Sequence, residues 1–222
     1  MPIVLYHFPL SPPCRTALCT AKALGLDVNI KIVNLFAKEQ FSEDYVKMNP
    51  EHTIPALDDN GLIIWHSHAI ATYLVSKYGK DDSLYPKDPA KRVVVDQRLY
   101  FDATTLFPRL AATAAPLMFL GKTDVEPDKK AAIYEALGTL EKYLEPTGWV
   151  AGDQVTVADI ACAVTTASMQ AVGVVLDPYP KIREWLQQCN SNIPHFEEEN
   201  MEGLKETAEA MKSKVTHNIY AP

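Results

Sequence analysis

The sequence predicts a small α/β unit followed by an all-helical region, so the expected fold class is α/β plus all-α. Within the first 80 residues, short strand and helix patterns alternate in the order β-α-β-α-β-β-α. After the proline-rich connector at residues 85–89, helical periodicity replaces every strand pattern. A chain of 222 residues with 47% apolar and 22% charged content suits one or two packed domains. We therefore expect one domain over residues 1–80 and a second over residues 89–222.

The first strand and helix meet at Ser11. An apolar run at residues 3–6 predicts the strand, and Pro12 and Pro13 suit a first helical turn, where a missing N–H group costs nothing. Ser11 therefore lies where free backbone N–H groups and the positive end of the helix dipole point outward. Its hydroxyl can cap the helix, or it can donate a hydrogen bond to an anion such as a thiolate. The segment taken alone favours the cap.

The rest of the α/β unit follows from alternation and turn signals. Val28, Ile30 and Ile32 keep a period of two, which predicts a half-buried strand. The remaining signals, in chain order, are a short helix from Ser42 to Asn49-Pro50, a hairpin with Asn60-Gly61 between residues 56–57 and 62–65, and a helix from residue 69 that stops at Gly79.

The second region reads as helices only. Residues 90–120 have a helical pattern that Pro108 and Pro116 should bend. Thr156-Val157-Ala158-Asp159 is a capping signature ahead of an apolar run, and helix nucleation explains it better than catalysis. Core-facing helical spacing recurs in two further sets: Ile133, Leu137, Leu140 and Leu144, then Ile182, Trp185, Leu186 and Cys189.

Composition excludes several functional classes. A net charge of −7 argues against a nucleic-acid or anionic-membrane partner, because neutralising phosphates takes clustered Lys and Arg. No apolar stretch approaches a membrane span, and the first residues have no basic region typical of a secretion signal. The cysteines Cys14, Cys19, Cys162 and Cys189 form no CxxC pair and no zinc spacing. We expect a cytoplasmic protein with buried thiols and no metal site.

Two further junctions could bind a ligand. If the Ile54-Pro55 bond is cis, the backbone N–H and C=O of Ile54 face outward, where an extended peptide could pair with them. The commoner alternative is a trans proline at a strand edge. At the second junction, residues 65–70, Ser67 can cap a helix and hold a carboxylate with neighbouring N–H groups, or it can cap alone.

Together, and in this order, these motifs resemble the cytosolic glutathione transferases, within them the insect epsilon class and next the delta class. The resemblance covers the whole chain. It is carried by Leu10-Ser11-Pro12-Pro13-Cys14-Arg15, residues 49–58 (Asn49 to Asp58), Ser67-His68-Ala69-Ile70, Tyr73-Leu74-Val75, residues 84–88, Phe101-Asp102, residues 106–109 and Val157-Ala158-Asp159. It implies a thioredoxin-like N-terminal domain, an all-helical C-terminal domain and a homodimer.

The resemblance also implies site residues. Ser11 matches the catalytic serine, whose hydroxyl would favour the glutathione thiolate. Glutathione would be a co-substrate, with no prosthetic group, and the partner substrate a small hydrophobic electrophile in a detoxification-type reaction. The implied glutathione-binding residues are Gln40, His52, Thr53, Ile54, Pro55, His66, Ser67, His68 and Arg109. Phe8 and Leu10 could line the electrophile cleft, with Pro108, Ala112 and Pro116 at i, i+4 and i+8 on the opposing helix, although such a stripe could equally be interdomain core.

One position departs from the family pattern. His66 stands where the family usually has an acidic residue that helps hold the γ-glutamyl ammonium. A neutral imidazole can accept one hydrogen bond, whereas a protonated one would repel the ammonium. The loss of a charge-assisted contact would cost on the order of 1.5–3 kcal/mol in glutathione affinity.

The sequence is compatible with two alternative functions. Ser11-x-x-Cys14 has the spacing of a thiol-oxidoreductase motif, but serine occupies the nucleophile's position. A non-catalytic carrier of hydrophobic ligands would use the same cleft, and His66 modestly favours it. Ser11 favours the enzyme.

Overall fold

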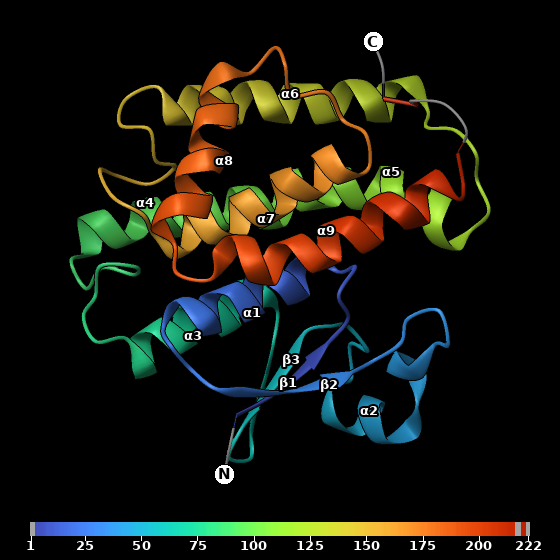
Figure 1. Ribbon diagram of the computed structural model, residues 1–222. Helices are drawn as coiled ribbons and strands as arrows, with labels where there is room; N and C mark the ends of the chain where they lie inside the picture. Colours follow the sequence, from blue (N-terminus) through green and yellow to red (C-terminus); the bar gives the residue numbers. More distant parts are fainter. Residues whose placement is uncertain (1–2, 216–218, 221–222) are drawn as a thin grey trace.

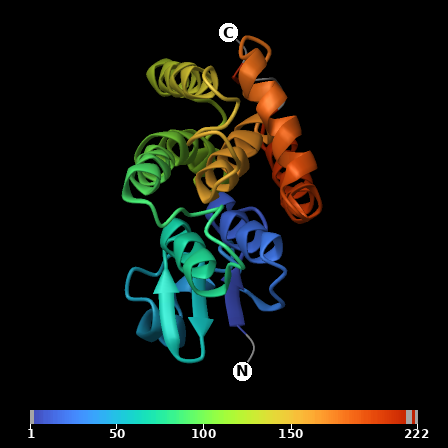
Figure 2. The ribbon, with the colours of Figure 1, turned by 90° about the vertical axis from the view of Figure 1, so that its left-hand side faces the viewer.

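The computed structural model describes residues 3–215 and 219–220, and it confirms the predicted fold class. A β-sheet with its helices forms one part, and a stack of helices forms the other (Figures 1 and 2). The first part spans residues 3–78 and the second residues 89–212. The extreme residues of the two expected domains, 1–2 and 221–222, lie outside the described residues.

The sheet has the strand order β2-β1-β3-β4. Its strands are β1 (Ile3–His7), β2 (Val28–Ile32), β3 (Ala56–Asp59) and β4 (Leu62–Trp65). β1 pairs in parallel with β2 and antiparallel with β3, so Leu5 lies between Ile30 and Leu57. β3 and β4 form the predicted hairpin, and Asn60 and Gly61 take the positive φ angles of 55° and 92° that its tight turn requires.

Helices cover both faces of the sheet. One face carries α1 (Pro12–Ala23) and α3 (Ser67–Tyr78), and the fully buried Leu5 and Leu57 pack there with side chains from both helices. The other face carries η1 (Glu39–Phe41) and α2 (Glu43–Met48), where Tyr45 packs on Val33 and Ala56. The C-terminal end of β1 therefore lies beside the N-terminus of α1, and the N-terminal end of β3 lies beside the N-terminus of α3.

The prediction of a half-buried β2 is wrong for two of its three apolar residues. Val28 is buried against α1, but Ile30 and Ile32 are 40% and 57% exposed. β2 is the edge strand, and of its residues only Val28 joins the core of the sheet. The alternating apolar residues correctly predict the strand, but they do not predict how much of β2 is covered by α1.

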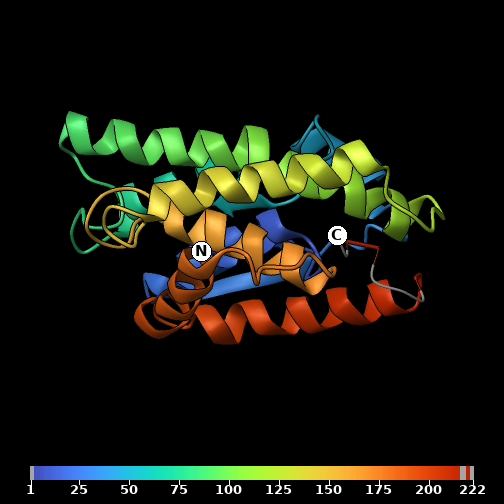
Figure 3. The same ribbon diagram turned by 90° about the horizontal axis from the view of Figure 1, so that it is seen from above.

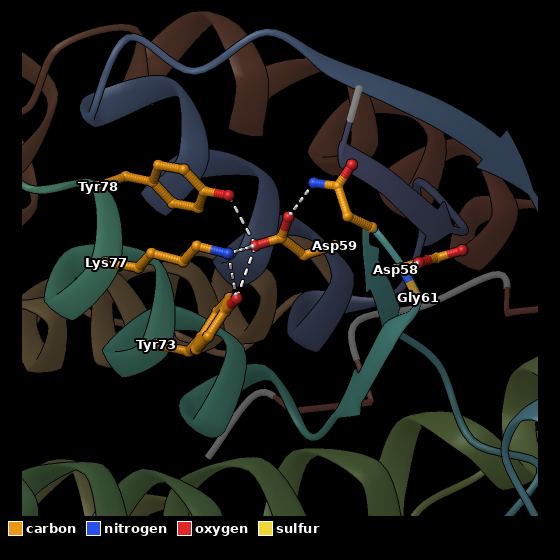
Figure 4. Close-up of polar contacts among 7 residues, drawn as sticks. Asp58, Asp59, Gly61, Tyr73, Lys77 and Tyr78 are labelled. Carbon is orange, nitrogen blue, oxygen red and sulfur yellow. Dashed lines mark hydrogen bonds and ion pairs between the residues drawn. The ribbon is translucent and has the colours of Figure 1, made fainter. Parts of the chain in front are cut away.

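A buried carboxylate anchors the hairpin to α3 (Figure 4). Asp59 is 2% exposed and accepts hydrogen bonds from Tyr73 Oη (2.6 Å), Lys77 Nζ (2.7 Å), Tyr78 Oη (2.7 Å) and Asn60 Nδ2 (2.8 Å). Burial acts to raise the pKa of Asp59, but these hydrogen bonds outweigh it and hold the pKa well below its usual range. We call these five residues the Asp59 cluster.

The second part is built from helices. Its elements are α4 (Pro89–Phe101), η2 (Asp102–Leu106), α5 (Phe107–Phe119), α6 (Pro127–Leu144), α7 (Val157–Ala171), α8 (Pro180–Asn192) and α9 (Phe196–Lys212). α4 and α5 follow each other along one side of the stack, seen from above in Figure 3. They match the predicted helix over residues 90–120, and η2 between them is a π-helical turn. Pro108 is the second residue of α5 and has no N–H group to continue the α-helical ladder.

α7 is the buried centre of the stack, and its predicted capping signature is confirmed. The Asp159 carboxylate accepts hydrogen bonds from Thr156 N (2.8 Å), Val150 N (3.0 Å) and Trp185 Nε1 (3.0 Å). This carboxylate therefore organises the start of α7 and holds α8 beside it.

Arg15 joins the two parts of the molecule. It is 1% exposed, and its guanidinium donates to Asn200 Oδ1 (2.8 Å), to Pro9 O and to Ser168 Oγ. Gly203 on α9 lets Arg15 and Pro9 approach, because a Cβ there would lie 2.3 Å from Pro9 O. The N-terminus of α1 is thus fixed against α7 and α9. No helix within the described residues is long and apolar enough to cross a membrane.

Candidate active site

Ser11 lies at the junction of β1 and α1, as predicted. It is the N-cap of α1, with Oγ accepting a long hydrogen bond of 3.4 Å from Cys14 N. Capping uses a lone pair of the oxygen and leaves the hydroxyl proton free to be donated. The two interpretations of Ser11 are therefore compatible, because one hydroxyl can cap the helix and donate to an anion.

A polar pocket of about 480 Å³ opens beside Ser11. It lies where the end of β1, the segment after β2, the turn before β3 and the start of α3 meet η2 and α5. It is lined by Ser11, Pro13, Leu35, Gln40, His52, Thr53, Ile54, His66, Ser67, His68, Ala103 and Phe107. Most of the predicted glutathione-binding residues are thus brought together.

The turn before β3 is shaped by Asn49. This fully buried side chain donates through Nδ2 to Thr53 O (2.8 Å), and Tyr45 Oη donates to the same carbonyl (2.7 Å). The Ile54-Pro55 bond is cis, so the less common of the two predicted alternatives is present. Ile54 lines the pocket, whereas Pro55 is buried and does not contribute to the lining.

Ser67 is the first residue of α3, so the prediction that it caps this helix is wrong. The cap position belongs to His66, at φ 66° and ψ 116°, and its side chain makes no capping hydrogen bond. Ser67 is buried and lines the pocket at the start of α3. Its hydroxyl and the first N–H groups of α3 are placed where they could bind a carboxylate.

Each histidine beside Ser67 is paired with a carboxylate. His66 Nε2 lies 3.2 Å from Glu51 Oε2, and both side chains are about half exposed. His68 Nε2 lies 2.8 Å from Asp102 Oδ2, and the Asp102 side chain is only 4% exposed. Gln40 Oε1, another polar atom of the pocket lining, is buried and has no partner among the described residues. The pocket therefore offers polar groups on several sides.

An apolar pocket of about 140 Å³ adjoins the polar one and shares Ser11 with it. Phe8 and Leu10 line it, as predicted, together with α5 residues and a few from α7 and α9. The α5 residues are Phe107, Leu110, Ala111, Ala114, Ala115, Met118 and Phe119.

The predicted lining face of α5 is wrong. Pro108 and Ala112 are exposed, Pro116 is half-buried, and none of the three lines the pocket. The helix instead presents Phe107, Ala111 and Ala115, one position earlier. The spacing i, i+4, i+8 specifies a stripe along the helix but not which of the neighbouring stripes faces the pocket, and tertiary packing selects the one that begins at Phe107.

Arg109 also differs from its expected position at the glutathione site. Its guanidinium donates to Ala132 O and pairs with Glu135 Oε2 at 3.0 Å, both on α6. It lines neither of the two pockets around Ser11.

Comparisons with known proteins agree with this geometry. Residues 1–76 match the family model "Glutathione S-transferase, N-terminal domain", and residues 123–188 match "Glutathione S-transferase, C-terminal domain". The chain is 44% identical to "Glutathione S-transferase D7" from Anopheles gambiae over 96% of this chain and 98% of that protein. The chain belongs to the glutathione S-transferase family. The predicted resemblance is confirmed.

Solved structures of insect glutathione transferases have the same fold. An epsilon-class enzyme from the housefly Musca domestica is 46% identical with a TM-score of 0.91, over 96% of this chain and 98% of that one. A homologue from Drosophila mojavensis with bound glutathione is 43% identical with a TM-score of 0.90, over the same shares. Each of these two similarities extends over both the sheet-containing part and the helical part of the chain.

In this glutathione transferase, Cys14 is not placed for redox chemistry. It is fully buried beneath Ser11, and burial raises the pKa of its thiol to about 12, although hydrogen bonding to Ser11 acts in the opposite direction. The Cys14 thiol is therefore protonated and inert.

Several residues of the transferase site were missed by sequence reasoning. Leu35, Ala103 and Phe107 line the polar pocket. The apolar pocket is also lined by Ser168 of α7, by Val172 directly after α7 and by Thr207 of α9. The partners Glu51 and Asp102 were also missed, although Asp102 stands in the Phe101-Asp102 motif of the family resemblance. No local pattern distinguishes the α7 and α9 residues from ordinary core.

Proposed function

We propose that this chain is a serine-type glutathione transferase that conjugates the glutathione thiolate to small hydrophobic electrophiles. The observation that carries this proposal is the position of Ser11, whose side chain lines both the polar and the apolar pocket. A peptide thiol held in the polar pocket would present its sulfur at Ser11, next to an electrophile in the apolar pocket. A sulfur–carbon bond would form there, and an aryl halide substrate would lose its halide ion.

The role of Ser11 is to favour the thiolate. A free thiol has a pKa of about 8.5, and lowering it by about two units takes roughly 2.7 kcal/mol. One hydrogen bond to a charged group, about 1.5–3 kcal/mol, and a helix dipole, about 0.3–1 kcal/mol, can supply this. Ser11 Oγ stands at the N-terminus of α1, where both effects act.

The two parts of the chain would bind different substrates. Residues 1–80 would bind glutathione through Gln40, His52, Thr53, Ile54, His66, Ser67 and His68, and residues 89–222 would supply most of the electrophile site. The net charge of −7 fits small-molecule substrates rather than nucleic acid. We expect the enzyme to act in the cytoplasm.

We further propose a homodimer. Leu106 is fully buried and Phe101 packs on Tyr143, but Tyr100 on α4 is 70% exposed and Val93 is 53% exposed. α9 packs against α1 and α7, so it does not cover these α4 side chains. A second copy is the commonest cover for such surface. Sedimentation at micromolar concentration tests this, and a monomer that still conjugates glutathione would contradict it.

The test of the function is Ser11→Ala. Removing the hydroxyl should lower the conjugation rate by about 10- to 100-fold, the loss of a hydrogen bond to a charged group. The glutathione affinity should stay within about twofold, because the peptide arms bind elsewhere. The measurements are an aryl-halide conjugation assay and a calorimetric titration with glutathione.

Ser191→Ala is the matched control, because Ser191 is exposed on α8 and only hydrogen-bonds Gln187 O. Equal activity of Ser11→Ala and the control would remove Ser11 from the mechanism. Glutathione binding with no conjugation in the unsubstituted protein would instead support the carrier alternative, which family membership does not favour.

A further inference from the structure

Among the described residues, no carboxylate lines the polar pocket, although its proposed ligand carries a cation. Glutathione has an α-ammonium group as well as two carboxylates and a thiol. The polar side chains that line the pocket are hydroxyls, an amide and three histidines. A buried or half-buried ammonium needs an anionic partner. Within the described residues, the candidates for this partner are carboxylates that contact a lining residue from behind.

Two carboxylates meet this condition. Glu51 contacts His66, and Asp102 contacts His68, on the two sides of Ser67. Asp102 is 3% exposed and lies behind His68 at 2.8 Å, so an ammonium could reach it only by displacing that ring. Glu51 is 49% exposed, and His66 beside it is 61% exposed. A ligand in the pocket can approach this pair directly.

Glu51 is held by a rigid turn. Its N–H donates to Asn49 Oδ1 (3.0 Å), and the next N–H, of His52, donates to Asn49 O (2.9 Å). Asn49 is itself fully buried, and its side-chain amide donates a hydrogen bond to Thr53 O. The same turn therefore places His52 and Thr53 in the pocket wall and fixes the backbone of Glu51, whose carboxylate lies 3.2 Å from His66 Nε2.

We propose that Glu51 is the anionic partner of the glutathione ammonium, and that it acts together with His66. The inference rests on the proposed function. His66 Nε2 faces the Glu51 carboxylate at 3.2 Å. In the neutral imidazole that carries its proton on Nε2, Nδ1 is left as a hydrogen-bond acceptor. The ammonium then donates to Nδ1 and is attracted by the negative charge of Glu51. The pair of His66 and Glu51 thus binds the ammonium in place of a carboxylate in the pocket lining.

The test compares two ligands by calorimetry: glutathione, and the analogue in which hydrogen replaces the α-ammonium group. Glu51→Gln keeps the shape of the side chain and removes its charge. It should raise the Kd of glutathione about fivefold, as expected for a half-exposed charge contact, and leave the Kd of the analogue unchanged. His66→Glu in the Glu51→Gln background should restore the affinity for glutathione, because it returns a carboxylate to the same place.

Glu43→Gln is the matched control, because Glu43 is exposed on α2, pairs with Lys47 and changes the net charge equally. Equal losses for both ligands in Glu51→Gln, or no loss, would overturn the inference while leaving the proposed function intact. A loss confined to glutathione in Asp102→Asn and absent in Glu51→Gln would also overturn it. If the unsubstituted protein binds neither ligand, the proposed function fails, and this inference fails with it.

Discussion

The two ends of α3 hold polar groups in opposite ways. Tyr73, Lys77 and Tyr78, in its C-terminal half, all donate to Asp59, which also accepts from Asn60 (Figure 4). At the N-terminal end, Asp102 has one hydrogen bond, from His68, and its buried Oδ1 has no partner among the described residues. The two carboxylates are almost equally buried, at 2% and 3% exposure.

The difference separates stability from binding. A saturated carboxylate has no capacity left for a ligand, so the Asp59 cluster can only anchor the hairpin to α3. The other end of the same helix forms the wall of the polar pocket, through His66, Ser67 and His68, and retains unused polar capacity. Substitutions at the two ends should therefore change different quantities.

The largest expected effect is on stability. Asp59→Ala removes the acceptor of four donors and should lower the free energy of unfolding by about 3 kcal/mol. For a chain of this size, that corresponds to a fall in Tm of roughly 6–12 °C. The glutathione affinity of the folded protein should not change. Thermal unfolding and calorimetric titration are the measurements.

Asp58→Ala, on the neighbouring residue, removes only one hydrogen bond, from Gly61 N, and serves as the control. If Asp59→Ala binds glutathione more weakly at a temperature where the variant is folded, the two ends of α3 do not have separate roles in stability and binding.

Asp59→Ala should also show that the contribution of Asp59 to stability depends on pH. Because the pKa of Asp59 in the folded state lies below its ordinary value of 3.8, the unfolded chain takes up a proton first as the pH falls. The contribution of Asp59 is thus complete above pH 3.8 and is lost below it. The difference in unfolding free energy between the unsubstituted protein and Asp59→Ala should shrink from pH 5 to about pH 2. A constant difference would mean that charge is not the source of its stability.

Asp102→Asn should act on binding instead. The amide cannot hold His68 as a carboxylate does, so the affinity for glutathione should fall about fivefold, a change of roughly 1 kcal/mol. Asp102 positions His68 rather than contacting the ammonium, so the analogue without the ammonium should lose affinity equally. The free energy of unfolding should change by about 1 kcal/mol, well below the effect of Asp59→Ala. A larger loss of stability than in Asp59→Ala would reverse the comparison.

The smallest expected effect comes from removing one donor of the saturated cluster. Tyr78→Phe should cost about 0.5–1 kcal/mol, because Lys77, Tyr73 and Asn60 still donate to Asp59. Conjugation rate and glutathione affinity should match those of the unsubstituted protein. Denaturant unfolding can measure a change of this size, and any kinetic effect would contradict the structural role of the cluster.

The sequence by itself determined the local features of this protein. The junction at Ser11 follows from an apolar run and two prolines, and the hairpin follows from Asn60-Gly61, whose backbone must take positive φ. The change from alternating elements to helices after residue 89 is equally local. Steric limits and hydrogen bonds between near neighbours decide such features, so a short segment carries enough information to predict them.

Only the tertiary structure decided which surfaces meet. α5 packs with Phe107 and Ala111 toward the pocket, where the sequence pattern indicated Pro108 and Ala112. The edge position of β2 exposes Ile30 and Ile32. The pairing of His66 with Glu51 and of His68 with Asp102 joins residues 15 to 34 positions apart in the chain. A helical or strand period specifies that a face exists, but its partner depends on the phase of the whole element and on contacts between distant segments.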